Sequence, residues 1–194
     1  MSSTAGLRER KKAETRQAVH EATLRLTIER GLDHVTVEAI ADAANISRRT
    51  FSNYFDSKED ALLYGDEQHL GTLVRRVREQ PAGQSAWRAL RGAMESLHDE
   101  SGVPDREWHM RARLAMRHPS LRARQLASRF RLENELSQAV TGRERPGDAA
   151  PELVTAAFLA ALRVASQWWC AEHETRTLRE LTGQAFDQMA QRFD

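Results

Sequence analysis

A group of cationic, hydroxyl and amide side chains between positions 36 and 58 has the chemistry of a surface that binds nucleic acid. Arg48 and Arg49 each carry a guanidinium that can pair with O6 and N7 of guanine, and Asn53 can pair with adenine. Hydroxyls and a lysine ammonium suit phosphate oxygens, which position a protein on a duplex. The candidate DNA-contacting residues are Thr36, Ser47, Arg48, Arg49, Thr50, Ser52, Asn53, Tyr54 and Lys58.

Two short helices joined by a tight turn are needed to position these side chains. Thr36 can cap the first helix and Ser47 the second, while Asn45 between them tolerates the left-handed backbone of a sharp turn. Phe51 and Phe55 lie four apart, so both can face inward and leave a polar front. The inward positions of the first helix are Val37, Ile40, Ala41 and Ala44. This pattern is typical of a helix that reads the major groove.

The segment resembles the DNA-binding domain of the TetR family of bacterial transcriptional regulators, over residues 1 to about 65. Asn45 stands where the family usually has Gly, Thr27 where Phe is common, and Tyr54 where His is frequent. Tyr54 keeps a hydrogen-bonding tip, and Thr27 indicates looser packing. The residues that carry the resemblance are Gly31, Thr36, Ile40, Ala41, Ala44, Ser47, Phe51, Tyr54, Phe55 and Lys58.

The resemblance implies an architecture and a mechanism. It implies a three-helix DNA-binding domain over residues 1–56 and a helical ligand-binding and dimerisation domain over 57–194. The last two long helices would pair with their copies in a homodimer, which would bind a palindromic operator on double-stranded DNA. A small-molecule effector would move the helix that begins near Ser57 and release the DNA. A ligand-responsive repressor is therefore the expected function, and an activator remains open.

Composition sets the broad class of the protein. The chain has 194 residues, a formal net charge of +1 and 40% hydrophobic residues, which suits one small and one medium packed domain. No apolar run is long enough to span a membrane, and the charged N-terminus lacks the apolar core of a secretory signal. The single cysteine, Cys170, excludes an intramolecular disulfide framework and indicates a cytoplasmic protein. Basic residues gather in the leading arm, from Arg8 to Arg16.

Helical periodicity runs through the whole chain, and strand alternation is nearly absent, so we predict an all-α fold. The segment 152–172 is apolar on more than one side, which predicts a central helix or a subunit interface. Ser57 should cap a long helix, with Asp60 at the capping-box position. The helices are expected at about 8–30, 36–44, 47–55, 57–79, 86–100, 108–117, 121–140, 152–172 and 176–192.

Aromatic and methionine residues of the second domain are candidates for an apolar effector pocket, although ordinary core packing is the more common role of such side chains. The candidates are Trp87, Met94, His98, Trp108, Met116, Phe130, Trp168 and Trp169.

Seven arginines and no acid lie between Trp108 and Leu132. They form either a solvated face or a site for an anionic effector such as an acyl-CoA. Around MRHPSLRAR the chain resembles an actinobacterial subgroup that includes the mycofactocin-associated regulator, for which acyl-CoA ligands are suggested.

Enzyme function is the main rival class. The sequence has no HExxH, P-loop, GxSxG or nucleotide-binding glycine pattern, and we expect no catalytic residue, metal or cofactor. Its acid–histidine neighbours lie one or two residues apart and diverge on a helix, so they make poor metal ligands. A helical ligand-sensing protein without DNA binding is a second rival. Its expected mark is acidic or missing residues at positions 48, 49 and 58, where this chain has the basic residues Arg48, Arg49 and Lys58.

Overall fold

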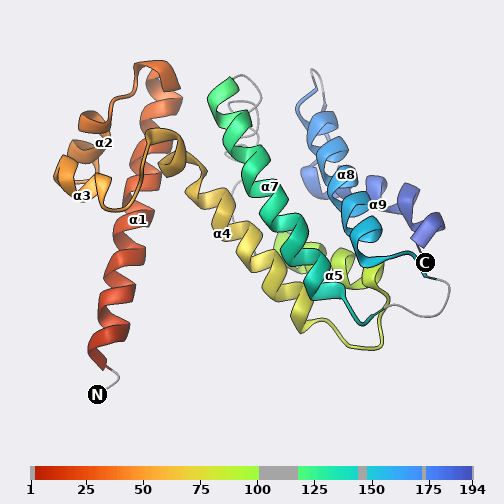
Figure 1. Ribbon diagram of the computed structural model, residues 1–194. Coiled ribbons are helices and arrows are strands. Elements are labelled where there is room, and N and C mark those ends of the chain that lie inside the picture. Colours follow the sequence, from red (N-terminus) through yellow and green to blue (C-terminus); the bar gives the residue numbers. More distant parts are fainter. Residues whose placement is uncertain (1–2, 101–117, 144–147, 172–173, 194) are drawn as a thin grey trace. The chain divides into compact units, whose positions relative to one another are not determined.

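The computed structural model describes residues 3–100, 118–143, 148–171 and 174–193. Every element over these ranges is a helix, and no strand occurs among them, which confirms the all-α prediction. None of the helices in this part of the chain is both long and apolar enough to cross a bilayer. The chain divides into two compact units, Met1–Gln68 and His69–Asp194, whose helices are coloured along the sequence in Figure 1.

The first unit is built on a long N-terminal helix. It comprises α1 (Ser3–Arg30), the 3-10 turn η1 (Leu32–His34), α2 (Val37–Ala43), α3 (Arg48–Ser52) and the first part of α4 (Lys58–Glu79). Helix α1 begins at Ser3, five residues before the predicted Arg8, and ends at Arg30 as expected. The core of this unit consists of Val19, Leu26, Val35, Ile40, Ala41, Phe51, Phe55 and Ala61.

Thr27, where the sequence indicated looser packing than Phe would give, is buried and hydrogen-bonded. It is 1% exposed, and its Oγ1 donates 2.7 Å to the carbonyl oxygen of Thr23. Thr23 in turn donates 2.7 Å to the carbonyl of Val19. Both hydroxyls are therefore satisfied on the backbone of α1, so the cost of burying them is offset.

The turns and caps that set the angles between α1, α2 and α3 agree with the sequence. Gly31 ends α1 with φ 80°, and Asn45 follows α2 with φ 54°, the left-handed value that its type tolerates. Thr36 Oγ1 accepts a 3.2 Å bond from the backbone N–H of Ala39, and Ser47 Oγ accepts one of 3.0 Å from Thr50. Both predicted N-caps are confirmed.

Helix α4 begins after the predicted N-cap Ser57, with Asp60 three residues on, and passes through the division between the two units. Ser57 Oγ accepts a 3.1 Å bond from the backbone N–H of Asp60, and donates 2.8 Å to its carboxylate. The units divide at Gln68 and His69, inside α4. The expected functional division after residue 56 therefore differs from the division by packing, which assigns the first turns of α4 to the first unit.

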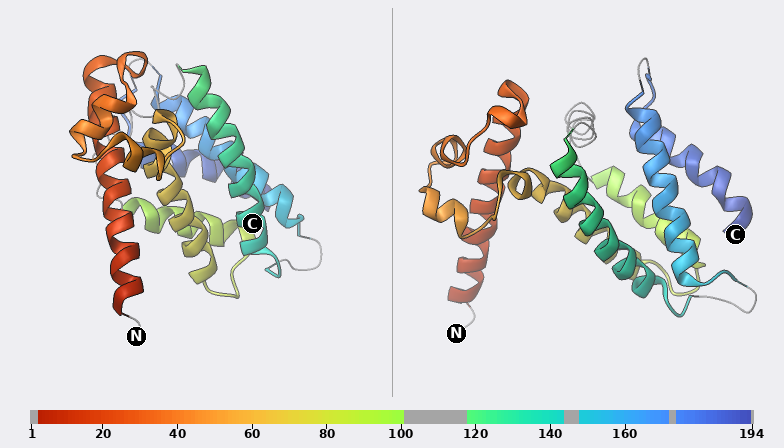
Figure 2. Two further views of the ribbon diagram at one scale, coloured as in Figure 1. Left: turned by 60° about the vertical axis from the view of Figure 1, so that its left-hand side comes forward. Right: turned by 45° about the horizontal axis from the view of Figure 1, so that its top comes forward.

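Among its described residues, the second unit packs helices α5 (Ala86–Glu100), α7 (Pro119–Val140), α8 (Pro151–Trp169) and α9 (Leu178–Phe193) together with the rest of α4. Helices α8 and α9 lie side by side in both views of Figure 2. Their core is aromatic: Phe158 of α8 stacks on Phe186 of α9 at 5.0 Å between ring centroids. Trp87 of α5 meets the two rings edge-on at 6.4 and 5.7 Å. The helix expected at 108–117 lies outside the described residues.

Arg143 ties the loop after α7 to the C-terminal end of α4. Its Nη1 donates 2.7 Å to the carbonyl oxygen of Pro81, and its Nη2 donates to those of Gln80 and Val77 at 2.9 and 3.2 Å. The last carbonyls of a helix lack intrahelical donors, so one guanidinium supplies the missing partners there.

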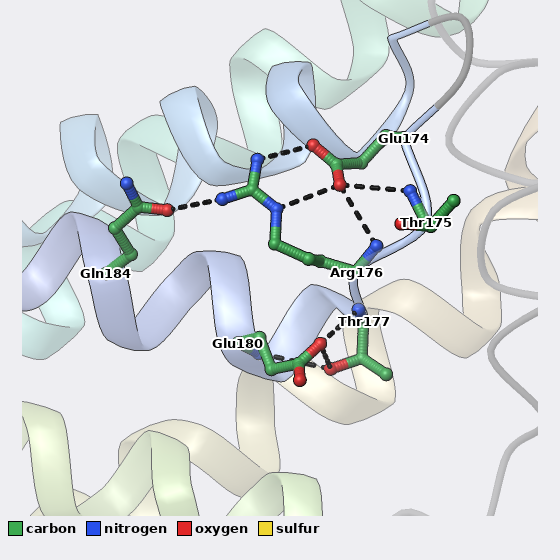
Figure 3. A network of polar contacts seen from close by, with 6 residues as sticks. All are labelled: Glu174, Thr175, Arg176, Thr177, Glu180 and Gln184. Atoms are coloured by element: carbon green, nitrogen blue, oxygen red, sulfur yellow. Dashed lines mark hydrogen bonds and ion pairs between the residues drawn. The ribbon is translucent and has the colours of Figure 1, made fainter.

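Helix α9 begins at Leu178, two residues later than predicted, because Thr177 caps it (Figure 3). Thr177 accepts from the N–H of Glu180 at 3.2 Å, and Glu180 Oε2 accepts from the N–H of Thr177 at 2.7 Å. This bond lowers the pKa of Glu180. A side-chain bond from Arg176 lowers the pKa of Glu174 to about 2. Both carboxylates favour folding above their ordinary pKa and lose that effect as pH falls through the lowered values.

The left-handed backbone at Asn45 leads us to predict how substitutions at this position change stability. Asn45→Ala should lower the free energy of unfolding by about 1 kcal/mol, because an ordinary side chain at positive φ clashes with the following carbonyl. Asn45→Gly should lose much less, since glycine has no Cβ. Urea denaturation followed by circular dichroism measures both variants. Equal stability of Asn45→Ala and the parent chain would contradict the prediction.

Candidate nucleic-acid interface

Helix α3 has a buried apolar back and an exposed polar front. Phe51 is 1% exposed and Phe55 7%, and their rings lie 5.8 Å apart against Ile40 in the core. Four candidate base readers lie on the exposed side, as the sequence predicted: Arg48, Arg49, Ser52 and Asn53. Helix α3 has only five residues, so most of its exposed side chains can contact the same few base pairs of one major groove.

The two arginines of this front differ in their surroundings. Arg48 Nη1 lies 2.9 Å from Glu38 Oε1, and both side chains are mostly exposed. Arg49 is exposed, and its side chain forms no ion pair with the described residues. Glu38 carries no signal of this contact in the sequence, because positions 38 and 48 belong to different helices and only the turn between them brings the two side chains together.

Three hydroxyls lie at the N-termini of α2 and α3. Thr36 and Ser47 use oxygen lone pairs as caps, and Ser47 Oγ lies 2.8 Å from Thr50 Oγ1. Capping uses the acceptor side of the Thr36 hydroxyl, so its proton is still available to a phosphate oxygen. The N–H groups of both first turns add partial positive charge at these positions.

Tyr54 follows α3 and receives a cation from α1. The guanidinium carbon of Arg16 lies 5.8 Å from the centre of the Tyr54 ring, a cation–π arrangement. The sequence placed Arg16 in a basic leading arm but gave no signal that pairs it with Tyr54, which is far along the chain. The pairing puts a positive charge over the ring of a tyrosine whose hydroxyl was predicted to contact phosphate.

Lys58 is a structural tie as well as a candidate phosphate contact. Its Nζ donates 2.8 Å to the carbonyl oxygen of Leu32 and 2.9 Å to that of Val35, so it holds the first turn of α4 against η1. An ammonium has three protons. Two are used within the protein, and the charge still contributes to the potential at the start of α4.

Four of the described effector candidates belong to one apolar cluster of the second unit, with Trp87 and Trp169 in its buried core and Met94 and Trp168 packed against it. Trp87 and Trp169 are buried in the core at 1% and 5% exposure, and Phe130 is 64% exposed. The remaining described candidates, Met94, His98 and Trp168, are half-buried. Trp108 and Met116 lie outside the described residues. Core packing, the commoner role weighed above, therefore describes Trp87 and Trp169.

The basic stretch of α7 is mostly a surface feature, with one exception. Arg122, Arg124 and Arg131 are exposed. Arg129 is turned inward, and its Nη2 donates 2.9 Å to the carbonyl oxygen of Leu159 in α8. Burial and the nearby Arg163 lower the pKa of Arg129, although it stays cationic. The first three of the seven arginines, Arg111, Arg113 and Arg117, lie outside the described residues.

No group of three or more His, Cys, Asp or Glu side chains suited to a metal ion occurs within the described ranges. An open surface depression of about 550 Å³ lies along α9 and is lined by Glu180, Gly183, Gln184, Asp187 and Gln188.

Comparison with known proteins agrees with this architecture. Residues 20–64 match the family described as bacterial regulatory proteins, tetR family, and residues 84–194 match the MftR C-terminal domain. The HTH-type transcriptional regulator TcmR of Streptomyces glaucescens is 34% identical over an alignment 184 residues long, and the match covers 88% of this chain and 79% of TcmR.

Two solved structures share the fold. Thermus thermophilus FadR, a TetR-family repressor in complex with lauroyl-CoA, has a TM-score of 0.62 at 24% identity, covering 90% of this chain and 93% of FadR. PfmR, a TetR-family regulator also from Thermus thermophilus, has a TM-score of 0.51 at 21% identity, covering 89% of this chain and 97% of PfmR. The chain belongs to the TetR family of bacterial regulatory proteins and is a DNA-binding transcription regulator.

Proposed function

We propose that this regulator binds an inverted-repeat operator in the cytoplasm as a homodimer, with α3 of each subunit in a major groove, and that it represses transcription until an effector binds. The cationic and amide front of α3, held from behind by Phe51 and Phe55, is the observation that carries the proposal. Two identical reading helices related by a two-fold axis require two half-sites of opposite direction.

The roles within the interface follow from side-chain chemistry. Arg48, Arg49 and Asn53 are the base readers, because their bidentate groups match guanine or adenine edges, and Thr50 and Ser52 lie beside them. Phosphate contacts come from residues at helix ends and from Tyr54 with its neighbour Arg16. The proposed phosphate-contacting residues are Thr36, Ser47, Tyr54, Lys58 and Arg16.

Helices α8 and α9 are the proposed dimer interface. Leu153 of α8 is 63% exposed, and Ala156, one turn further on, is exposed as well. An exposed leucine on an alanine-rich helix favours burial against a second copy, since apolar surface removed from water stabilises association.

The proposed effector is anionic with an apolar tail, such as an acyl-CoA. Helix α7 presents Leu126 and Phe130, which are 58% and 64% exposed, beside exposed arginines. This combination suits a molecule with a phosphate-bearing head and a hydrocarbon chain. FadR, which shares the fold, was solved with lauroyl-CoA. The effector must favour the conformation that does not fit the operator.

Arg49→Ala tests direct base readout. The variant should lose about 1–3 kcal/mol of binding free energy on the operator and relax the preference at one base pair, because a bidentate contact is removed. Selection from random DNA followed by gel shifts measures both effects. Arg88→Ala, which removes an exposed arginine of α5, is the matched control and should bind as the parent chain does. Equal losses on operator and random DNA would contradict the assignment of Arg49 as a base reader.

Lys58→Ala tests the double role of this lysine. It should lower the free energy of unfolding by about 1–3 kcal/mol, because two backbone carbonyls lose a charged donor. It should also weaken operator and random DNA alike and reduce the salt slope by about one, because one cation is lost. Lys58→Arg retains the charge and should keep the slope. Thermal melts and a salt series of binding isotherms separate the two effects; an unchanged slope would leave only the structural role.

Lauroyl-CoA should weaken the protein–operator complex, while coenzyme A and laurate alone should act less, because each supplies only half of the recognised chemistry. A hundredfold loss of DNA affinity requires about 2.7 kcal/mol of coupling. Fluorescence anisotropy of labelled operator measures the loss, with a thermal shift as an independent sign of binding. Unchanged DNA affinity and unchanged melting temperature with lauroyl-CoA would rule out this effector class.

A further inference from the structure

We propose that Glu38 is a positioning residue of the DNA interface, which holds the Arg48 guanidinium in place and so sets the base preference at the operator position that Arg48 reads. The inference rests on the proposed function of α3. It starts from the 2.9 Å contact between Arg48 Nη1 and Glu38 Oε1. Glu38 lies in the first turn of α2, and Arg48 is the first residue of α3.

The backbones that carry this pair are held by the core of the first unit. Ile40, two residues after Glu38, is 0% exposed, and Phe51, three residues after Arg48, is 1% exposed. The N-terminal turns of both helices are also capped, by Thr36 and Ser47. The ion pair therefore joins two fixed points, and the freedom that it restricts is that of the arginine side chain itself.

The ion pair of Glu38 and Arg48 contributes little to the stability of the fold. The two side chains are 72% and 55% exposed, and ion pairs in such surroundings contribute between zero and about 1 kcal/mol to folding. A guanidinium has five N–H donors. One nitrogen held by a single carboxylate oxygen leaves the others available for O6 and N7 of guanine. The pair is thus compatible with base readout, and it restricts the orientation of the guanidinium that contacts the base.

An arginine side chain that is already ordered before DNA binds should discriminate better between bases. A long side chain ordered only when DNA binds loses rotamer freedom at that moment, and an already ordered one loses less. Glu38 also adds negative charge near the phosphates, which disfavours any binding mode that lacks the arginine–base contact. Arg49, which has no ion pair among the described residues, lacks this restraint. The position that Arg49 reads should therefore be insensitive to changes at Glu38.

The test compares base preferences in variants of the full-length dimer. Random-pool selection with the parent chain gives the operator, and selection with Arg48→Ala identifies the position that Arg48 reads. Glu38→Gln should lower discrimination at that same position by about two- to twelvefold, from the cost of ordering one side chain. It should also bind random DNA more tightly, because it removes a negative charge. The double variant Glu38→Gln/Arg48→Ala should discriminate no worse than Arg48→Ala alone.

Two further variants separate positioning from charge and from folding. Glu38→Asp keeps the charge but shortens the reach, so it should relax the same position without gaining affinity for random DNA. Glu95→Gln removes the exposed pair with Arg91 in α5 and should leave every base preference unchanged. Circular dichroism melts of all variants confirm that each is folded at the assay temperature.

The outcomes distinguish this inference from the proposed function. If the parent chain selects an operator but Glu38→Gln and Glu38→Asp keep its full discrimination, or relax a different position, the positioning role of Glu38 is wrong. Losses that multiply in the double variant, or a preference that Arg48→Ala does not change, also overturn it. If the parent chain selects no sequence, the proposed function itself fails.

Discussion

The burial of Phe51 and Phe55 behind α3 is the interaction on which the DNA interface depends. A helix of five residues has too few internal hydrogen bonds to form on its own in water. The two rings are 1% and 7% exposed, and each buried phenylalanine contributes about 1.5–3 kcal/mol. That exceeds what the single cap at Ser47 supplies, about 1 kcal/mol. Packing of the two phenylalanines against the core therefore stabilises α3. Because these rings face the core, the polar side chains on the opposite side of the helix face outward.

Stability and recognition are consequently separated between the two sides of the same helix. The apolar side contributes several kcal/mol to folding, whereas the exposed pair of Glu38 and Arg48 contributes at most about 1 kcal/mol. Residues on the front can therefore differ between related regulators without unfolding the domain. Ser47 belongs to both sides of α3, because its hydroxyl accepts a helix N–H while lying at an exposed helix end, and Thr36 has the same double position at the start of α2.

Local features of the interface could be predicted from the sequence because their partners are near in the chain. The caps at Thr36 and Ser47, the left-handed Asn45 and the inward phenylalanines all depend on neighbours within four residues. The contacts of Lys58 with carbonyls 26 and 23 residues away could not be predicted, since tertiary packing alone brings them together. Trp87 shows the same limit in the second unit: an aromatic ring fits a pocket or a core equally well, and only its packing on other rings decides.

Under the proposed function, helix α4 is the element through which an effector acts, because it begins in one unit and ends in the other. Its first residue, Lys58, donates to two carbonyls around η1, and the carbonyls in and just after its last turn accept three bonds from Arg143. The two part-buried hydrogen bonds at Lys58 together contribute about 1–3 kcal/mol, which is comparable with the roughly 2.7 kcal/mol of coupling that a hundredfold response needs. An effector that moves α4 would therefore carry η1 and the helices packed on it as one body rather than detach them. The reading helix keeps its own geometry in such a transition, and what changes is the position at which it is presented to the DNA.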